Sequence, residues 1–275
     1  MTRLGIVLLA AFALLAIAGP LLVGDPTAYV AAPHLPPSAE HWFGTTGQGQ
    51  DVFAQTVAGA GPTLLVGFAA GLAMVAVGAL VGAAAGYFGG WIDELLSLAT
   101  NVFLVLPGLP LAVVVAAWLP PGPATLVAVL VFTGWAWTAR VVRAQVQCMR
   151  KRDWVAAARL AGEPHWRVLI VEILPNLKGL VASAAVGATV YAIGAQVGLE
   201  FLGLGDPGAV TWGTNLYWAA NDAALLTRSW WTFVPTGACV ALVGFALALV
   251  NAGLDAAANP RLAAGNPLLD TEVSA

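Results

Sequence analysis

Three histidines and two cysteines are the residues of this 275-residue chain best suited to metal or redox chemistry. His34 and His41 lie in the same proline-rich segment, and a pair of imidazoles can bind a transition metal such as nickel. Simple solvation at the surface is the more common state of such histidines. His165 lies in a different, basic part of the chain, and Cys148 and Cys239 lack the spacing of a zinc or redox site. We therefore predict no resident metal, with His34 and His41 as the only pair left open.

Enzymatic chemistry also lacks its usual residues. The sequence contains no GxxxxGK[ST] phosphate loop, and no cluster of His, Asp or Glu of the kind that a membrane enzyme needs at one membrane face. Isolated polar residues instead interrupt apolar runs, and four of them are candidates to line a pore: Asn101, Tyr191, Gln196 and Glu200. Polar groups inside a membrane either mark a transport path or join helices. Both roles stay open here, and Glu200 also fits a place at the membrane surface.

The elements that must position these residues are long apolar helices. The chain is 60% hydrophobic and 9% charged, with a mean hydropathy of +0.84, which is typical of an integral membrane protein. About 20 mostly apolar residues suffice for a helix to cross a bilayer. Six runs qualify: Leu4–Val23, Gly61–Phe88, Leu95–Leu119, Ala124–Ala139, Gly179–Leu199 and Trp230–Leu254. We expect an all-α integral membrane protein with six transmembrane helices.

Three of these runs have distinctive features. Leu95–Leu119 is broken by two prolines, and Ala124–Ala139 is short, so that Arg140 and Arg143 are expected to extend from its end toward water. The first run also resembles a signal peptide, but it exceeds the usual length of about 7–15 apolar residues, so we expect an uncleaved span. Four glycines of the second run are expected to allow close packing against other spans: Gly67, Gly71, Gly78 and Gly82.

Basic residues set the orientation. With the N-terminus in the cytoplasm, ten of the eleven Lys and Arg residues lie on the cytoplasmic side, and Arg228 is the exception. Asp93 and Glu94, in a predicted inner loop, say little because acidic residues contribute weakly to this rule. Gly24–Ala60 would be an outer segment, with a short interfacial helix over Asp51–Val57. The second outer segment brings tryptophans to an expected interfacial belt: Trp212, Trp218, Trp230 and Trp231.

Residues 140–178 form a basic segment that holds eight of the eleven Lys and Arg residues. Asp153 can cap a helix that runs to Ala161, and Gly162 stands where a left-handed residue ends a helix. Pro164 suits the first turn of a second helix, which Pro175 is expected to perturb or end. The pattern predicts two short helices joined by a tight turn.

Three interpretations of this segment compete. A solvated basic loop explains the arginines, but not the alanine-rich helix or the turn. A DNA-binding helix-turn-helix is hard to place in a major groove when the membrane holds both ends. A docking element explains the small side chains, which allow a helix to enter a groove on a partner, with Trp154 and Trp166 as anchors.

Four stretches resemble the permeases of ABC importers, in particular the C-type permease of dipeptide, oligopeptide and nickel importers. They are Ala157-Ala158-Arg159 with Gly162 and Ile173–Asn176, which resembles the family's "EAA" signature, then Trp42–Asp51, Phe201–Gly205 and Asp255–Arg261. The resemblance covers about Trp42 to Leu262. It implies a type I ABC importer permease architecture, in which the basic segment is a cytoplasmic coupling helix that contacts an ATPase. The residues implied for this coupling are Asp153, Trp154, Ala156, Ala157, Ala158, Arg159, Gly162, Glu163, Pro164 and His165.

The resemblance also implies the partners. They are a homologous B-type permease, two cytoplasmic ABC ATPase subunits or one fused ATPase, an extracytoplasmic substrate-binding protein and the lipid bilayer, without nucleic acid. The chain would bind no cofactor itself and would be no enzyme, since ATP and Mg belong to the ATPase subunits. Di- or oligopeptides are the expected substrates, with nickel, glutathione or an oligosaccharide as alternatives. A stand-alone six-span channel or secondary transporter is the rival function.

The chain departs from the family pattern at three positions. Ala156 replaces the glutamate of the coupling signature, Gln50 replaces an arginine of the outer signature, and Thr46 replaces an aspartate. We expect docking to survive, because the slim helix and the glycine turn remain.

The resulting organisation has three parts. Residues 1–60 form the first span and the outer loop, residues 61–262 form the permease core, and residues 263–275 form a tail. We expect a multi-pass protein of the bacterial cell membrane (inner membrane), with both termini in the cytoplasm.

Overall fold

The computed structural model describes residues 2–258. Arg261, the last residues of the Asp255–Arg261 stretch and the predicted tail therefore lie outside the described residues. The described chain is helical, without β-strands apart from one isolated bridge between Thr45 and Asp51. Its α-helices are α1 (Thr2–Leu22), α2 (Val52–Ala58), α3 (Ala60–Phe88), α4 (Gly90–Val105), α5 (Gly108–Ala116), α6 (Pro123–Arg150), α7 (Asp153–Leu160), α8 (His165–Arg167), α9 (Lys178–Phe201), α10 (Trp212–Asn221) and α11 (Val234–Ala258).

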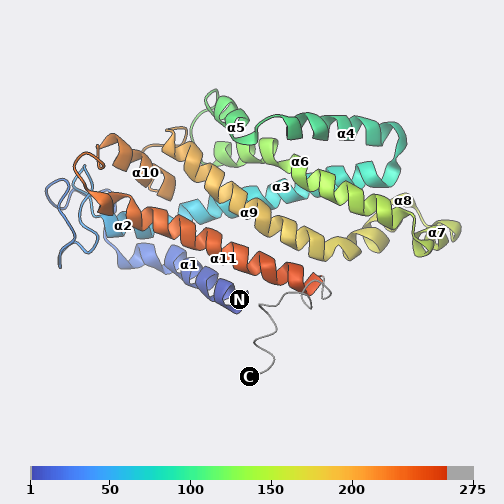
Figure 1. Cartoon of the computed structure of the whole chain (residues 1–275), viewed down its shortest axis with the longest axis horizontal. Helices are drawn as coiled ribbons and strands as arrows, with labels where there is room; N and C mark the ends of the chain where they lie inside the picture. Colours follow the sequence, from blue (N-terminus) through green and yellow to red (C-terminus); the bar gives the residue numbers. More distant parts are fainter. Residues whose placement is uncertain (1, 259–275) are drawn as a thin grey trace, which may run out of the picture.

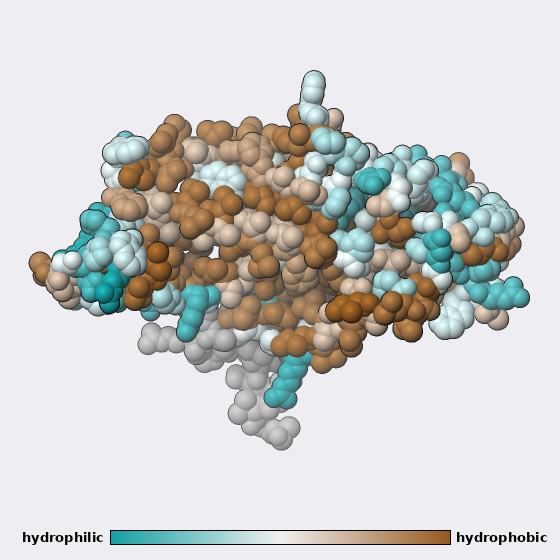
Figure 2. Space-filling view, turned by 180° about the vertical axis from the view of Figure 1, so that it is seen from behind, coloured by the Kyte–Doolittle hydropathy of each residue, from teal (hydrophilic) through white to brown (hydrophobic). Residues whose placement is uncertain are grey.

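The long helices α1, α3, α6, α9 and α11 run lengthwise through the molecule (Figure 1). One end of the bundle carries α7 and α8 and is called the basic end here. The opposite end carries residues 24–51 and α10 and is called the loop end. Hydrophobic residues cover the middle of the face shown in Figure 2, and hydrophilic residues gather at both ends. This distribution fits a bundle that crosses a bilayer along its length.

Five helices are long and apolar enough to cross a membrane, and a sixth span results if α4 and α5 are taken together. This outcome confirms the predicted helical membrane architecture and the predicted proline break of the third run, where α4 and α5 are bent by 88° against each other. Proline causes the break: Pro107 lacks an N–H donor and disfavours helical backbone at Leu106, which is extended (φ −69°, ψ 132°).

The fourth span was predicted too short. Instead of ending at Ala139, α6 continues to Arg150. Its arginines find polar partners on α4, so they do not simply reach toward water. Arg140 Nη2 donates to Asn101 Oδ1 at 2.8 Å, and Arg143 Nη2 donates to Asp93 Oδ2 at 2.8 Å. Asp93 lies in the first turn of α4 and not in the predicted inner loop. Its ion pair with Arg143 joins α4 to α6.

The glycines of α3 lie where neighbouring helices come closest, as predicted. Gly71 faces Thr189 of α9, and Gly82 faces the backbone of Ala139 in α6. A Cβ atom on Gly78 would lie 2.6 Å from the carbonyl oxygen of Trp135, closer than real Cβ contacts allow. Because glycine has no Cβ, the three helices pack backbone to backbone here.

The loop end corrects one prediction and confirms another. Trp212 is fully buried and is not part of an interfacial belt: its indole Nε1 donates to the carbonyl oxygen of Thr56 at 2.9 Å. Its backbone N–H donates to Thr63 Oγ1 at 3.0 Å, so that α10 is fixed to α2 and α3. The short helix predicted over Asp51–Val57 is present as α2, with Asp51 as its N-cap.

Candidate functional site: the coupling segment, a membrane cavity and the loop end

The short helix α7 begins at Asp153, as predicted, but Asp153 is not its cap. Arg152 occupies the N-cap position, and no side chain caps the helix there. Asp153 lies in the first turn, where a negative charge interacts favourably with the helix dipole.

A tight turn ends α7 at Gly162, in agreement with the sequence. Gly162 has φ +84°, its N–H donates to the Arg159 carbonyl at 3.0 Å, and the Glu163 N–H donates to the Ala158 carbonyl at 3.2 Å. These two bonds define a Schellman motif, which needs a left-handed residue at this point. Pro164 directly precedes α8 and does not belong to its first turn.

The chain after α8 departs from regular helix. Residues Val168–Ile173 form a π-helical turn and Leu174–Leu177 a 3₁₀ turn before α9 starts at Lys178. Pro175 lies in the 3₁₀ turn, which confirms the predicted disturbance. Before this irregular stretch, Arg167 at the end of α8 forms an ion pair of 3.2 Å with Glu163, which precedes α8.

One face of α7 is free for contact. Leu160 is 89% exposed and Trp154 39%, whereas Val155 on the opposite face is fully buried. Between Trp154 and Leu160 the exposed positions are alanines, Ala156 and Ala157. The exposed face of α7 thus has small side chains in the middle and a larger apolar side chain at each end, a shape that suits insertion into a groove.

A cavity of about 620 Å³ opens between α3, α4, α5, α6, α9 and α11. Its wall includes Phe103, Thr133, Trp137, Ser183 and Tyr191, and the described lining residues carry no formal charge. Of the four candidate pore residues, only Tyr191 lies on this wall. Asn101 instead accepts a hydrogen bond from Arg140, outside the cavity.

Gln196 and Glu200 lie buried away from the cavity, at the loop end of α9. Glu200 is 3% exposed, and its Oε2 accepts a hydrogen bond of 2.7 Å from Thr211 Oγ1, the N-cap of α10. Gln196 Nε2 donates to Glu200 Oε1 at 3.1 Å. The carboxylate therefore holds the N-terminus of α10 against α9, where the helix dipole favours a negative charge.

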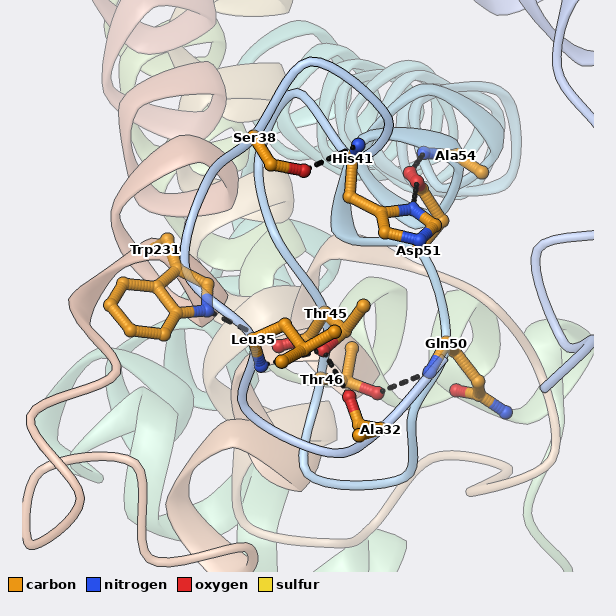
Figure 3. Close-up of polar contacts among 10 residues, drawn as sticks. All are labelled: Ala32, Leu35, Ser38, His41, Thr45, Thr46, Gln50, Asp51, Ala54 and Trp231. Carbon is orange, nitrogen blue, oxygen red and sulfur yellow. Dashed lines mark hydrogen bonds and ion pairs between the residues drawn. The ribbon is translucent and has the colours of Figure 1, made fainter. Parts of the chain in front are cut away.

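The loop end contains a compact cluster of polar contacts (Figure 3). Asp51 Oδ2 lies 2.9 Å from His41 Nδ1, while its Oδ1 accepts the Ala54 N–H at 2.9 Å as the cap of α2. Thr45 Oγ1 donates to the Ala32 carbonyl at 2.8 Å, and Trp231 Nε1 donates to the Thr45 carbonyl at 3.2 Å. These bonds join residues of the 24–51 segment to one another, to the start of α2 and to Trp231 in the 3₁₀ turn (Trp230–Thr232) that precedes α11.

The two histidines of this loop do not form a shared site. His41 pairs with Asp51, whereas His34 borders a small polar pocket with Asp222, and His34 has a positive φ of 57°. Burial raises the pKa of the Asp222 carboxyl, and the charge of His34 partly opposes this. Within residues 2–258, no group of three His, Cys, Asp or Glu residues is arranged to hold a metal ion.

Comparison with known proteins now gives these features a context. Residues 75–260 match the family described as "Binding-protein-dependent transport system inner membrane component". The chain belongs to this family. It is 34% identical to the dipeptide transport system permease protein DppC of Bacillus subtilis (83% of this chain, 71% of the relative) and 33% identical to the oligopeptide transport system permease protein OppC of the same organism (82% and 74%). It is also 32% identical to OppC of Mycobacterium tuberculosis H37Rv (82% and 77%).

Two departures of this permease from the family pattern lie together in space. The Thr46 N–H donates to the Gln50 carbonyl at 2.9 Å, and Thr46 Oγ1 accepts the Gln50 N–H at 3.1 Å. The Gln50 side chain in turn bonds to Gln55 and to the carbonyl of Thr27. Thr46 and Gln50 thus belong to one network of uncharged hydrogen-bonding groups in the loop.

Sequence reasoning missed one residue of the coupling segment's surroundings. Tyr87, near the end of α3, forms a hydrogen bond of 3.0 Å to His165 and lies under the guanidinium group of Arg159. No local pattern announces this role, because the partners lie more than 70 positions along the chain. Two aromatic residues, Tyr87 and Phe88, followed by two glycines at a span end were the only available signal.

Proposed function

We propose that this chain is the transmembrane permease subunit of an ATP-driven ABC importer for di- or oligopeptides. Membership of the permease family supports the transport role, and the relatives named above are dipeptide and oligopeptide permeases. The observation that carries the ATP-driven part is the exposed face of α7, which the Gly162 turn ends at the basic end of the bundle. A solvent-facing helix with small alanines between Trp154 and Leu160 fits a groove on a soluble ATPase.

The partners follow from this role. A homologous permease completes the pore, cytoplasmic ATPase subunits bind ATP and Mg, and an extracytoplasmic binding protein delivers the substrate. Closure of the ATPases moves α7 and the corresponding helix of the second permease. The two permeases then switch between inward-facing and outward-facing states as rigid bodies. The uncharged cavity beside Tyr191 is this chain's half of the pathway.

The proposed orientation places the basic end in the cytoplasm and the loop end outside, because basic residues stay on the cytoplasmic side. Cysteines introduced at the exposed positions Ser38 and Leu225 should react with an impermeant reagent added to intact cells. Cys148 is exposed near the basic end and should not react until the membrane is opened. Labelling of Cys148 in intact cells would contradict this orientation.

The decisive experiment for the function is reconstitution of the assembled importer in proteoliposomes with a labelled dipeptide. Uptake should require ATP, the ATPases and the binding protein. Because the described cavity wall carries no formal charge to bind the termini of a peptide tightly, selectivity should reside in the binding protein. Exchange of that protein for one with another ligand should change the substrate. ATP-independent peptide flux through the permease alone would contradict the proposal.

A further inference from the structure

Tyr87 occupies an unusual place for a tyrosine at the end of a membrane helix. It is the second-last residue of α3, yet only 2% of its surface is exposed. Tyrosines at such positions commonly keep the hydroxyl group in water. Here the coupling segment covers the ring, which belongs to an apolar cluster with Val155, Val168 and Ile173.

The same side chain contacts both sides of the Gly162 turn. Its hydroxyl lies 3.0 Å from His165 Nδ1, and the two rings meet edge to face at 5.8 Å between centroids. The guanidinium carbon of Arg159, at the other side of the turn, lies 5.0 Å from the centre of the Tyr87 ring. The Tyr87 side chain of α3 therefore contacts both the last turn of α7, through Arg159, and the first residue of α8, His165.

The helix that carries this ring also reaches the cavity. Met74 of α3 contributes to the cavity wall, and the glycines of α3 pack directly on α6 and α9. Since close-packed helices move as units and do not deform continuously, a displacement of the end of α3 reaches the wall of the cavity.

We propose that Tyr87 is a positioning residue that fastens the coupling segment to α3, so that movement of α7 is passed to α3 and from there to the cavity wall. The inference rests on the proposed function, because it names the contact through which ATP-driven movement enters the bundle. Tyr87 lies outside the coupling segment and outside every motif that carries the family resemblance.

Two substitutions separate its contacts. Tyr87→Phe removes the hydroxyl bond and keeps the ring, and Tyr87→Leu also removes the face that Arg159 covers. One hydrogen bond corresponds to about a two- to tenfold change in an equilibrium, and a cation–π contact to about a two- to fivefold change. In the assembled importer, peptide uptake per ATP hydrolysed should fall about two- to tenfold in Tyr87→Phe and further in Tyr87→Leu. Phe68→Leu, an exposed aromatic of the same helix, is the matched control and should leave the ratio unchanged.

His165→Ala removes the same bond from the side of the coupling segment, together with the ring contacts of His165 with Tyr87 and Phe88. If the bond carries the effect, the double variant Tyr87→Phe/His165→Ala should be no worse than the more affected single variant. Hydrogen exchange in residues 153–167 of the assembled importer gives a reading that does not depend on transport. Exchange should rise in Tyr87→Leu and stay at the parent level in Phe68→Leu.

The outcomes are distinct. Absence of ATP-dependent uptake in the parent importer contradicts the proposed function, and the exchange measurement then still tests whether Tyr87 holds the segment. Unchanged uptake per ATP in Tyr87→Leu overturns the inference, even if exchange rises. Reduced uptake without faster exchange in residues 153–167 also overturns it, because the defect then lies elsewhere. Lower uptake per ATP with faster exchange and a non-additive double variant supports it.

Discussion

Replacement of Gly162 by valine should uncouple this permease from the proposed ATPase partner without disturbing the membrane spans. The backbone at Gly162 is left-handed (φ +84°), and a Cβ atom there would meet nothing within 4 Å. The Cβ atom of a new side chain therefore causes no collision, and backbone strain is the main cost of the substitution. That cost is about 1–2 kcal/mol for a non-glycine residue in the left-handed region, and more for a β-branched one. A strain of this size lowers the population of the native turn about 5- to 30-fold.

The assay is binding-protein-stimulated ATP hydrolysis and peptide uptake by the importer in proteoliposomes, corrected for the amount of permease. Both rates should fall by about the same 5- to 30-fold factor in Gly162→Val. Because the Schellman bonds from Gly162 and Glu163 fix the end of α7, their loss tilts the face that carries Trp154 and Leu160. Insertion into the membrane should be unaffected.

Two control variants make this test specific. Gly162→Asn should retain most activity, since asparagine tolerates left-handed backbone. Ala156→Glu restores the residue usual in the family at an exposed position and should leave transport intact or improved. Full coupled activity in Gly162→Val would refute the reasoning, because the segment would then act only as a solvated basic loop.

Three further perturbations test the packing of the bundle, each by thermal unfolding of the purified protein. Asp93→Asn leaves Arg143 without its ion-pair partner and should lower the free energy of unfolding by about 1–3 kcal/mol, less than for a fully buried pair because the arginine side chain is 34% exposed. The double variant Asp93→Arg/Arg143→Asp, which exchanges the two charges, should restore part of this stability. Gly82→Ala places a methyl group against the backbone of α6 and should lower the free energy of unfolding by about 1–3 kcal/mol. The control Gly194→Ala adds a methyl group in open space and should be neutral or stabilising by up to about 1 kcal/mol. Equal effects of the two substitutions would contradict the close-packing argument. Burial raises the pKa of the Asp222 carboxyl above its unfolded value of about 3.9. Its contribution to the stability of the folded state is therefore fully present only below that value and is lost as the pH rises through the folded pKa. Asp222→Asn should be more stable than the parent at pH 7, and this difference should shrink toward pH 4; a difference that stays constant with pH would exclude the buried-carboxyl explanation.

The chain itself determined the features that depend on neighbours in the sequence. Apolar runs of sufficient length gave the spans, because a helix in a bilayer must satisfy its own backbone hydrogen bonds. The turn at Gly162 was predictable for a similar reason, since both Schellman bonds close within six residues. The proline-broken third run was visible too, although the 88° angle between α4 and α5 was not.

Only the tertiary structure decided how the polar residues are used. Arg140 and Arg143 marked the end of a predicted span, yet α6 continues past them, and α4 supplies Asn101 and Asp93 as their partners. Glu200 was a candidate pore residue, but in the fold it holds the start of α10. Tyr87 had no predicted role until the coupling segment folded over it. Each of these roles depends on a partner that chain folding brings from a distant segment, and helical periodicity records only which residues share a face, not what the face meets.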